Sequence, residues 1–181
     1  MDVSDEALAE AAAGGDGAAF ELLLDRVYDR LFRLCFRLTG SQAEAEDLTQ
    51  DICLALPGKL AGYKRRAKVT TWLYRVAVNA AIDRRRRAAS HAKAAEGWGD
   101  WEIARQAAAA DTRAQVDWLH TAMARLSPVM RDTLALILDD LTQAEVAEIL
   151  DTTEGTVAWR VSEAKKKLRE MRALEEKEGM Q

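Results

Sequence analysis

Residues 141–157 read LTQAEVAEILDTTEGTV, and they decide the fold of the C-terminal part of the chain. Residues 142–145 have the form of a capping box, in which a threonine and a glutamate three residues later close the start of a helix. Apolar spacing carries this short helix to Leu150, and residues 151–153 predict a turn. A long helix follows from Glu154 to beyond Leu168. Two helices joined by such a short turn indicate a helix-turn-helix.

The residues before this motif predict further helices. A stripe at helical spacing starts near residue 112 and consists of Val116, Leu119, Met123 and Leu126. Pro128 then suits the first position of another helix. Residues 91–111 differ, being rich in alanine with two glycines and two tryptophans, and we interpret them as a flexible linker. Residues 107–110 alternatively extend the following helix.

Residues 1–90 predict an antiparallel helical bundle. Asp16 caps a helix that ends at Gly40, and residues 41–44 cap a second helix that ends at Pro57-Gly58. After a polar loop, Thr70 or Thr71 caps a third helix, from Trp72 to about Arg87. The chain is therefore predicted to be all-α, with two small helical domains, residues 1–90 and 112–181, joined by a flexible linker, residues 91–111.

Composition supports this fold class and narrows the function. The 181 residues include only 2 prolines and 10 glycines, and 49% of them are hydrophobic, so a helical core is favoured over a β-sandwich. The acidic start predicts no signal peptide, and no apolar run approaches the length of a membrane span. Two histidines and two cysteines, Cys35 and Cys53, predict reduced thiols and no metal site.

Charge is strongly segregated along the chain, although its net value is only −4. Residues 1–58 carry 4 basic and 12 acidic side chains, a net of −8, and residues 94–181 carry 11 and 17, a net of −6. Residues 59–93 carry 11 basic side chains and 1 acidic one, a net of +10. A block this basic in an acidic protein predicts a polyanionic partner, most simply nucleic acid.

The basic block combines cations with aromatic rings. Tyr63, Trp72 and Tyr74 lie among its lysines and arginines, a combination suited to phosphates and unstacked bases. Asn79 shares one helical face with Trp72 and Arg75, and its amide can read a base edge. Trp72 is equally explained as a core anchor. The run Arg84–Arg87 is also explained in part as a charged helix end.

An acidic stripe lies on the helix before this block. Glu44, Asp47 and Asp51 share one face with Gln50 beside them, which suits docking of a basic partner or, alternatively, simple solvation. The carboxylates have no histidine or cysteine partner in sequence, and a Gly-rich phosphate loop is missing, so we find no catalytic set.

Three segments resemble the extracytoplasmic-function (ECF) sigma factors of bacterial RNA polymerase. Residues 45–51 (AEDLTQD) resemble the acidic polymerase-binding motif of that family. Residues 71–77 (TWLYRVA) with Asn79 resemble its promoter-melting helix. Residues 141–150, followed by Gly155-Thr156-Val157, resemble its second DNA-binding domain. The three segments occur in the family order and cover nearly the whole chain.

The resemblance implies a non-catalytic, cytoplasmic promoter-specificity subunit without a cofactor, with partners core RNA polymerase, promoter DNA and an anti-sigma factor. It implies that polymerase is bound by Asp47, Gln50 and Asp51. Melting and binding of the minus-ten element would fall to Lys64, Arg65, Arg66, Lys68, Trp72, Arg75, Asn79 and Arg86, with a flipped base in a pocket lined by residues 61–70. The minus-thirty-five element would be bound by Thr156, Trp159, Arg160, Lys165 and Lys167. The acidic linker, with Glu96, Asp100, Glu102 and Asp111, would follow the RNA path.

Two departures from the family pattern stand out. Asp151 occupies a turn position where glycine is usual, and aspartate tolerates the left-handed conformation better than most residues. Residues 158–163 read AWRVSE where the family is usually basic, so ordinary minus-thirty-five recognition is not implied. A stand-alone helix-turn-helix regulator remains an alternative. A helical enzyme acting on nucleic acid would need metal-binding carboxylates, and Asp83 is the single acid of the basic block.

Overall fold

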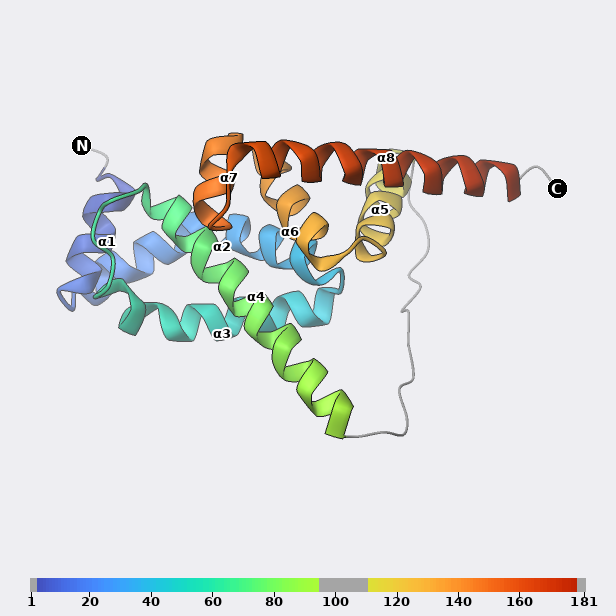
Figure 1. The fold of residues 1–181 in the computed structure, drawn as a ribbon. Coiled ribbons are helices and arrows are strands. Elements are labelled where there is room, and N and C mark those ends of the chain that lie inside the picture. Colours follow the sequence, from blue (N-terminus) through green and yellow to red (C-terminus); the bar gives the residue numbers. More distant parts are fainter. Residues whose placement is uncertain (1–2, 95–110, 179–181) are drawn as a thin grey trace.

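A computed structural model describes residues 3–94 and 111–178, and within these residues it contains eight α-helices and no strand (Figure 1). The all-α prediction is therefore confirmed. The helices are α1 (Asp5–Ala13), α2 (Gly17–Thr39), α3 (Gln42–Leu60), α4 (Val69–Ala94), α5 (Asp111–Ala124), α6 (Pro128–Ile137), α7 (Gln143–Ile149) and α8 (Glu154–Glu178). Most of the predicted linker, including Glu96, Asp100 and Glu102, lies outside the described residues.

Helices α1 to α4 pack as one bundle around α2. The two ends of α2 agree closely with the sequence prediction. The Asp16 carboxylate accepts a hydrogen bond from the backbone N–H of Ala19, and Gly40 ends the helix with a left-handed φ of 75°. The buried apolar side chains of α2 pack against the inward faces of α3 and α4. Helix α1 was not predicted. Ser4 caps it, and Leu8 and Ala9 are buried against the bundle.

Three predicted helix ends are wrong. Pro57 lies inside α3, which continues to Leu60, because Leu56 and Leu60 are both buried and hold the last turn against the core. Helix α4 begins at Val69, so neither Thr70 nor Thr71 is its cap. The Glu6 side chain of α1 instead accepts a hydrogen bond from the Val69 N–H at 3.4 Å. Helix α4 also runs to Ala94, beyond the predicted end.

Helices α5 to α8 contain the predicted helix-turn-helix as α7 and α8. The Thr142 hydroxyl accepts from the Glu145 N–H, and the Glu145 carboxylate accepts from the Thr142 N–H, so both halves of the capping box are present. Asp151 in the turn adopts a left-handed φ of 49°. This conformation explains why glycine is usual at the position, and aspartate tolerates it better than most residues. The turn is closed by a hydrogen bond from the Thr152 N–H to the Ala147 carbonyl at 2.9 Å.

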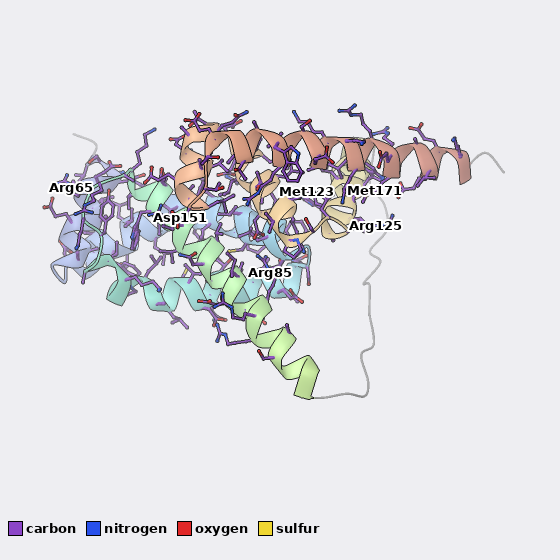
Figure 2. All side chains as sticks on the ribbon, viewed as in Figure 1. Arg65, Arg85, Met123, Arg125, Asp151 and Met171 are labelled. Atoms are coloured by element: carbon purple, nitrogen blue, oxygen red, sulfur yellow. The ribbon has the colours of Figure 1, made fainter. Side chains whose placement is uncertain are left out.

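The two groups of helices are packed against each other, and Figure 1 shows α7 beside the first turns of α4. Arg37 of α2 pairs with Asp139 at 2.8 Å, and Arg85 of α4 binds both carboxylate oxygens of Asp132 on α6, at 3.1 and 2.5 Å. Figure 2 places Arg85 near the middle of the molecule and Arg65 at its α1 end. We call α1–α4 the first half and α5–α8 the second half.

Candidate polymerase and nucleic-acid interfaces

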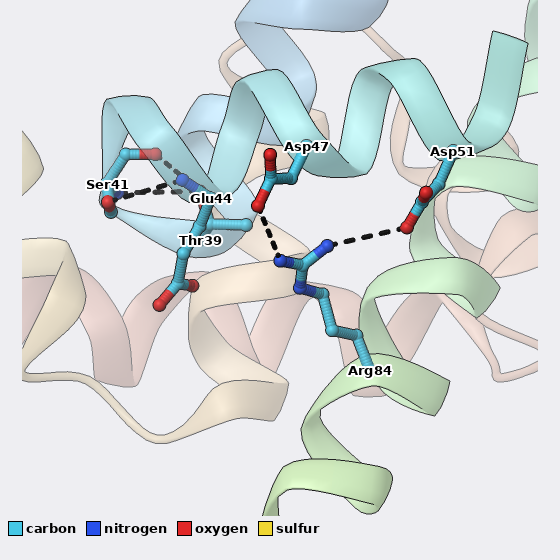
Figure 3. Close-up of polar contacts among 6 residues, drawn as sticks. All are labelled: Thr39, Ser41, Glu44, Asp47, Asp51 and Arg84. Carbon is cyan, nitrogen blue, oxygen red and sulfur yellow. Dashed lines mark hydrogen bonds and ion pairs between the residues drawn. The ribbon is translucent and has the colours of Figure 1, made fainter.

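The acidic stripe of α3 is exposed and is bridged by one cation from α4. Asp47, Gln50 and Asp51 all face solvent. The Arg84 guanidinium lies between the two carboxylates, with Nη2 3.2 Å from Asp47 Oδ2 and Nη1 3.5 Å from Asp51 Oδ2 (Figure 3). Because both aspartates are about two thirds exposed, these ion pairs contribute little stability. They do leave the pair of carboxylates only half neutralised and held side by side.

The stripe begins close to the start of α3. The Ser41 hydroxyl accepts from the Glu44 N–H at 3.4 Å, which fixes the first turn (Figure 3). Glu44 itself is exposed. The predicted docking face therefore starts at a capped helix end and runs along α3.

A cavity of about 260 Å³ lies at the loop between α3 and α4, at the place where the family resemblance implies a base pocket. Its lining comprises Gly62, Tyr63, Lys64, Arg66, Ala67, Thr71, Trp72, Arg75 and Glu148. The Tyr63 and Trp72 rings lie 5.4 Å apart between centroids. The Tyr63 hydroxyl donates to the Ala67 carbonyl at 2.8 Å, which holds the loop in shape. An aromatic wall with a basic rim suits a planar group attached to phosphates.

The surroundings of Trp72 agree with a core residue, and its contact with a base stays a prediction. Its side chain is half-buried and packs on the core, and it also lines the cavity. Tyr74, in contrast, is buried and donates a hydrogen bond to Asp139 of the second half. Burial, followed by that hydrogen bond, holds the pKa of Tyr74 well above its ordinary value. The expectation that Tyr74 is available to unstacked bases is therefore wrong for this arrangement.

The predicted minus-ten residues differ in what they contact. Lys64 and Arg66 are exposed at the cavity, and Asn79 and Arg86 are exposed further along α4. Arg65 has a left-handed φ of 53° and pairs with Glu10 at 2.7 Å.

Lys68 and Arg75 instead contact α7. Lys68 lies 3.6 Å from Glu145, and Arg75 donates to the Glu148 carbonyl. The second half therefore occupies part of the surface predicted for DNA.

The four-arginine run is divided among different partners. Arg84 pairs with the acidic stripe, Arg85 pairs with Asp132, and Arg86 pairs with Asp83 at 3.7 Å. Arg87 donates to the Asp83 carbonyl at 3.4 Å. Sequence reasoning missed the bridging roles of Arg84 and Arg85, because their partners lie more than 30 residues away and no local pattern marks them.

Asp132 is the buried charge of the contact between the halves. Burial raises its pKa, while the Arg85 hydrogen bonds and the charges of Arg131 and Arg160 act in the opposite direction. Burial also lowers the pKa of Arg131. Arg160 was predicted to contact the minus-thirty-five element, but it is half-buried and close enough to Asp132 to influence its carboxylate.

The outward face of α8 remains open in this arrangement. Trp159 has 59% of its surface exposed, and Lys165 and Lys167 are also exposed. Thr156 is half-buried, and its hydroxyl lies 2.9 Å from that of Thr153. Glu163 is half-buried. The face thus combines an apolar ring with a few lysines.

A second cavity, of about 540 Å³, lies between the halves. Arg30, Arg33 and Lys68 line it from the first half, and Asp139, Asp140 and Glu145 line it from the second. Opposite charges therefore face each other across the contact. Over residues 3–94 and 111–178, no group of three or more histidine, cysteine or acidic residues is arranged to hold a metal ion. In the same part of the chain, the helices are too short or too polar to cross a membrane.

Comparison with known proteins matches this chain to two family models. The family model for Sigma-70 region 2 matches residues 23–91, and the model for Sigma-70, region 4 matches residues 117–168. The ECF RNA polymerase sigma factor SigM of Mycobacterium tuberculosis (strain ATCC 25618 / H37Rv) is 31% identical over 91% of this chain and 83% of its own length. SigW of Bacillus subtilis (strain 168), also an ECF RNA polymerase sigma factor, is 28% identical over 86% and 89%.

Solved structures show the same fold. The sigma factor RpoE of Bartonella quintana, in complex with the anti-sigma factor NepR, has a TM-score of 0.73 at 23% identity, covering 85% of this chain and 96% of that one. CnrH in complex with the cytosolic domain of CnrY has a TM-score of 0.70 at 22% identity, covering 94% and 97%.

Region 2 followed by region 4 in one all-helical chain defines a two-region sigma factor. The chain belongs to the ECF RNA polymerase sigma factors. Its role is therefore that of a promoter-specificity subunit in transcription initiation, and sigma factors as a class are non-catalytic initiation subunits.

Proposed function

We propose that this chain binds core RNA polymerase with Asp47, Gln50 and Asp51, opens the minus-ten element with the basic loop and α4, and contacts upstream duplex DNA with α8. We place the first domain at residues 1–90 and the second at residues 112–181, joined by residues 91–111. The cytoplasm is the compartment that this role requires.

The observation that carries the proposal is the cavity beside Trp72, together with its basic rim. A flipped base gains stacking against the aromatic wall, and its flanking phosphates gain Lys64 and Arg66, which offsets the cost of unstacking. The acidic stripe lies on a different helix of the same half, α3. A polymerase docked on α3 therefore leaves the cavity free for a DNA strand.

The contact between the halves bears directly on this role. Glu145 and the Glu148 carbonyl compete with phosphate for Lys68 and Arg75 while these two residues contact α7. Promoter binding is therefore strengthened when α7 moves away from the first turns of α4. We propose that α8, which stays exposed, contacts duplex DNA with Thr156, Trp159, Lys165 and Lys167, and that Arg160 contributes less because of its place near Asp132.

Regulation by an anti-sigma factor is the remaining part of the proposal. The name of one similar structure describes the sigma factor RpoE in complex with the anti-sigma factor NepR, and that of another describes CnrH in complex with the cytosolic domain of CnrY. In this chain, which has the same fold, the ion pairs Arg37–Asp139 and Arg85–Asp132 join the two halves. An anti-sigma factor could therefore bind both halves at once.

Transcription with purified bacterial core polymerase on genomic fragments tests the function, with start sites mapped in the presence and absence of the chain. We expect start sites that appear only when the chain is present. A stand-alone regulator would instead bind duplex operator DNA tightly without polymerase and would give no new start sites.

The polymerase-binding residues are tested by charge reversal. Asp47→Arg and Asp51→Arg should each abolish binding to core polymerase at moderate salt, because a cation placed at a docked ion pair repels the basic partner and costs several kcal/mol. Both side chains are exposed, so the helical circular dichroism should not change. Glu21→Arg, which makes the same charge change at an exposed position on α2, outside residues 45–51, is the control. Normal core binding by both variants would remove this role from the stripe.

A further inference from the structure

Leu54 on α3 is the most exposed of the large apolar side chains in the described part of the protein, with 77% of its surface in solvent. Single exposed leucines are ordinary on protein surfaces, so exposure alone carries no conclusion. The position of Leu54 on its helix is what distinguishes it.

Leu54 continues the acidic stripe. Residues 47, 50, 51 and 54 follow the i, i+3, i+4, i+7 spacing of a single helical face, and all four are exposed. Pro57 and Gly58 extend this face by one more turn and are exposed as well. A Cβ built at Gly58 would meet no atom within 4 Å, so nothing covers this end of the helix. The opposite face of α3 is the one buried in the core.

The charges of the stripe are poorly suited to supply affinity alone. Arg84 already takes part of the attraction that Asp47 and Asp51 would offer a basic partner. Exposed charges are also screened within about 8 Å at physiological salt. Such groups mainly orient a partner and speed its approach, whereas affinity comes from apolar side chains buried at the centre of an interface.

We propose that Leu54 is the apolar anchor of the surface that binds core RNA polymerase, entering an apolar hollow that lies beside the basic groups facing Asp47 and Asp51. The proposal rests on the polymerase-binding role of the stripe and extends that surface by one helical turn. A second copy of this chain fits the face poorly, because a two-fold contact through Leu54 would bring two acidic stripes together.

The test measures the affinity of the full chain for bacterial core polymerase at low and high salt. Leu54→Ala should weaken binding about tenfold at both salt concentrations, because apolar burial is not screened. Asp51→Ala should lose affinity mainly at low salt. Leu174→Ala on α8 is the matched control, since Leu174 is 60% exposed on a different helix, and it should bind as the wild type does. Leu54→Met should retain most of the wild-type affinity, because methionine keeps an apolar side chain of similar size.

Each outcome separates this inference from the function on which it rests. A wild-type chain that does not bind core polymerase contradicts both. If Asp51→Arg fails to bind core polymerase while Leu54→Ala binds as the wild type does, the role of Leu54 as an anchor is overturned and the role of the stripe is kept. An effect of Leu54→Ala that disappears at high salt overturns it too. Sedimentation gives a further check, because a wild-type dimer that Leu54→Ala converts to a monomer would assign the face to a second copy instead.

Discussion

Trp72 shows how one side chain serves packing and recognition together. Its side chain packs on the core of the first half and also lines the cavity beside Tyr63. Asn79, two turns later on α4, is exposed and makes no such packing contact. The two residues therefore allow the effect of lost stacking to be separated from the effect of lost base-edge contacts.

We expect Trp72→Ala and Asn79→Ala to reduce promoter melting in the holoenzyme more than they reduce closed-complex binding. Stacking and base-edge contacts exist only once the strands separate, whereas Lys64 and Arg66 attract either form of DNA in a salt-dependent way. Permanganate footprinting of unpaired thymines, beside a binding assay, measures the two steps.

Thermal unfolding of Trp72→Ala is the necessary companion measurement, because this side chain is half-buried. Wild-type melting of DNA by both variants would show that neither residue is needed for opening. A variant that melts DNA poorly and is also unfolded would identify Trp72 as a core residue only.

At the scale of single elements, local signals explain which helices could be predicted. Asp16, Gly40 and Thr142 act on neighbouring backbone groups, so the sequence was enough to place the helix ends that they define. Helix α1 was missed because its alanine-rich sequence carries only Leu8 as a large buried side chain. Pro57 predicts a helix stop, whereas the burial of Leu60, which holds the last turn of α3, depends on the assembled bundle.

The cap of α7 gives a prediction for stability and its pH dependence. Thr142→Ala should destabilise the second half by about 1 kcal/mol, because it removes the hydroxyl that accepts from the Glu145 N–H. Hydrogen bonds from Thr142 hold the pKa of Glu145 below its ordinary value. The contribution of Glu145 is therefore present above the unfolded pKa and is lost as the pH falls through the folded pKa.

Denaturant unfolding of the wild type and Thr142→Ala, from neutral to acid pH, checks this expectation. The difference between the two proteins should shrink as Glu145 becomes protonated. Thr142→Ser, which keeps the hydroxyl, is the control. A difference that stays constant at all pH values would contradict the coupling of the cap to Glu145.

The outward face of α8 gives another prediction. Trp159 is exposed, whereas Arg160 is near Asp132 and Glu163 adds a negative charge, so few phosphate contacts are available. We expect weak binding of the full chain to duplex DNA, with a shallow dependence on salt. Glu163→Arg should tighten binding and steepen the logarithmic salt slope by about 0.9, the value for one neutralised phosphate.

Affinity for duplex DNA, measured against salt concentration, decides whether Glu163 lies at the bound DNA or away from it. Glu176→Arg makes the same charge change near the end of α8 and should leave the slope unchanged. An unaltered affinity and slope for Glu163→Arg would place this residue away from the DNA.

At the scale of the whole molecule, the decisive contacts join residues far apart in sequence. Arg37 and Asp139 are separated by 102 positions, and Arg85 and Asp132 by 47. The sequence indicates that both halves carry many charged side chains. Charge alone does not determine which of these side chains pair when they lie so far apart in sequence. For the same reason, the contacts of Lys68 and Arg75 with α7 were not foreseen, although both residues were selected as candidates for DNA binding.

Asp139 offers a test of this packing. Asp139→Asn should weaken the contact between the halves, because it removes the charge that receives Arg37 and the Tyr74 hydroxyl. Charge-assisted hydrogen bonds of this kind contribute roughly 1.5–3 kcal/mol, which corresponds to at least a tenfold rise in the open population. Small-angle scattering should report a larger radius of gyration, and single-stranded DNA should bind more tightly.

Asp140→Asn is a closely matched control. Asp140 is the next residue, is exposed and has a left-handed φ of 59°, which asparagine also tolerates. Its substitution should leave the radius of gyration unchanged. Equal expansion by both variants would show that general charge at the second cavity, and not the specific pairing of Asp139, holds the halves together.

The engagement of Lys68 and Arg75 by α7 has a consequence for dosage in the cell. A binding partner that accepts only the open chain responds to the concentration of open molecules, not to the total. If about one molecule in a hundred is open, the apparent dissociation constant is about a hundred times the intrinsic one. Occupancy of the promoter would then be decided by this internal equilibrium as much as by expression level. A substitution at the contact between the halves would act on transcription as a change in gene copy number does.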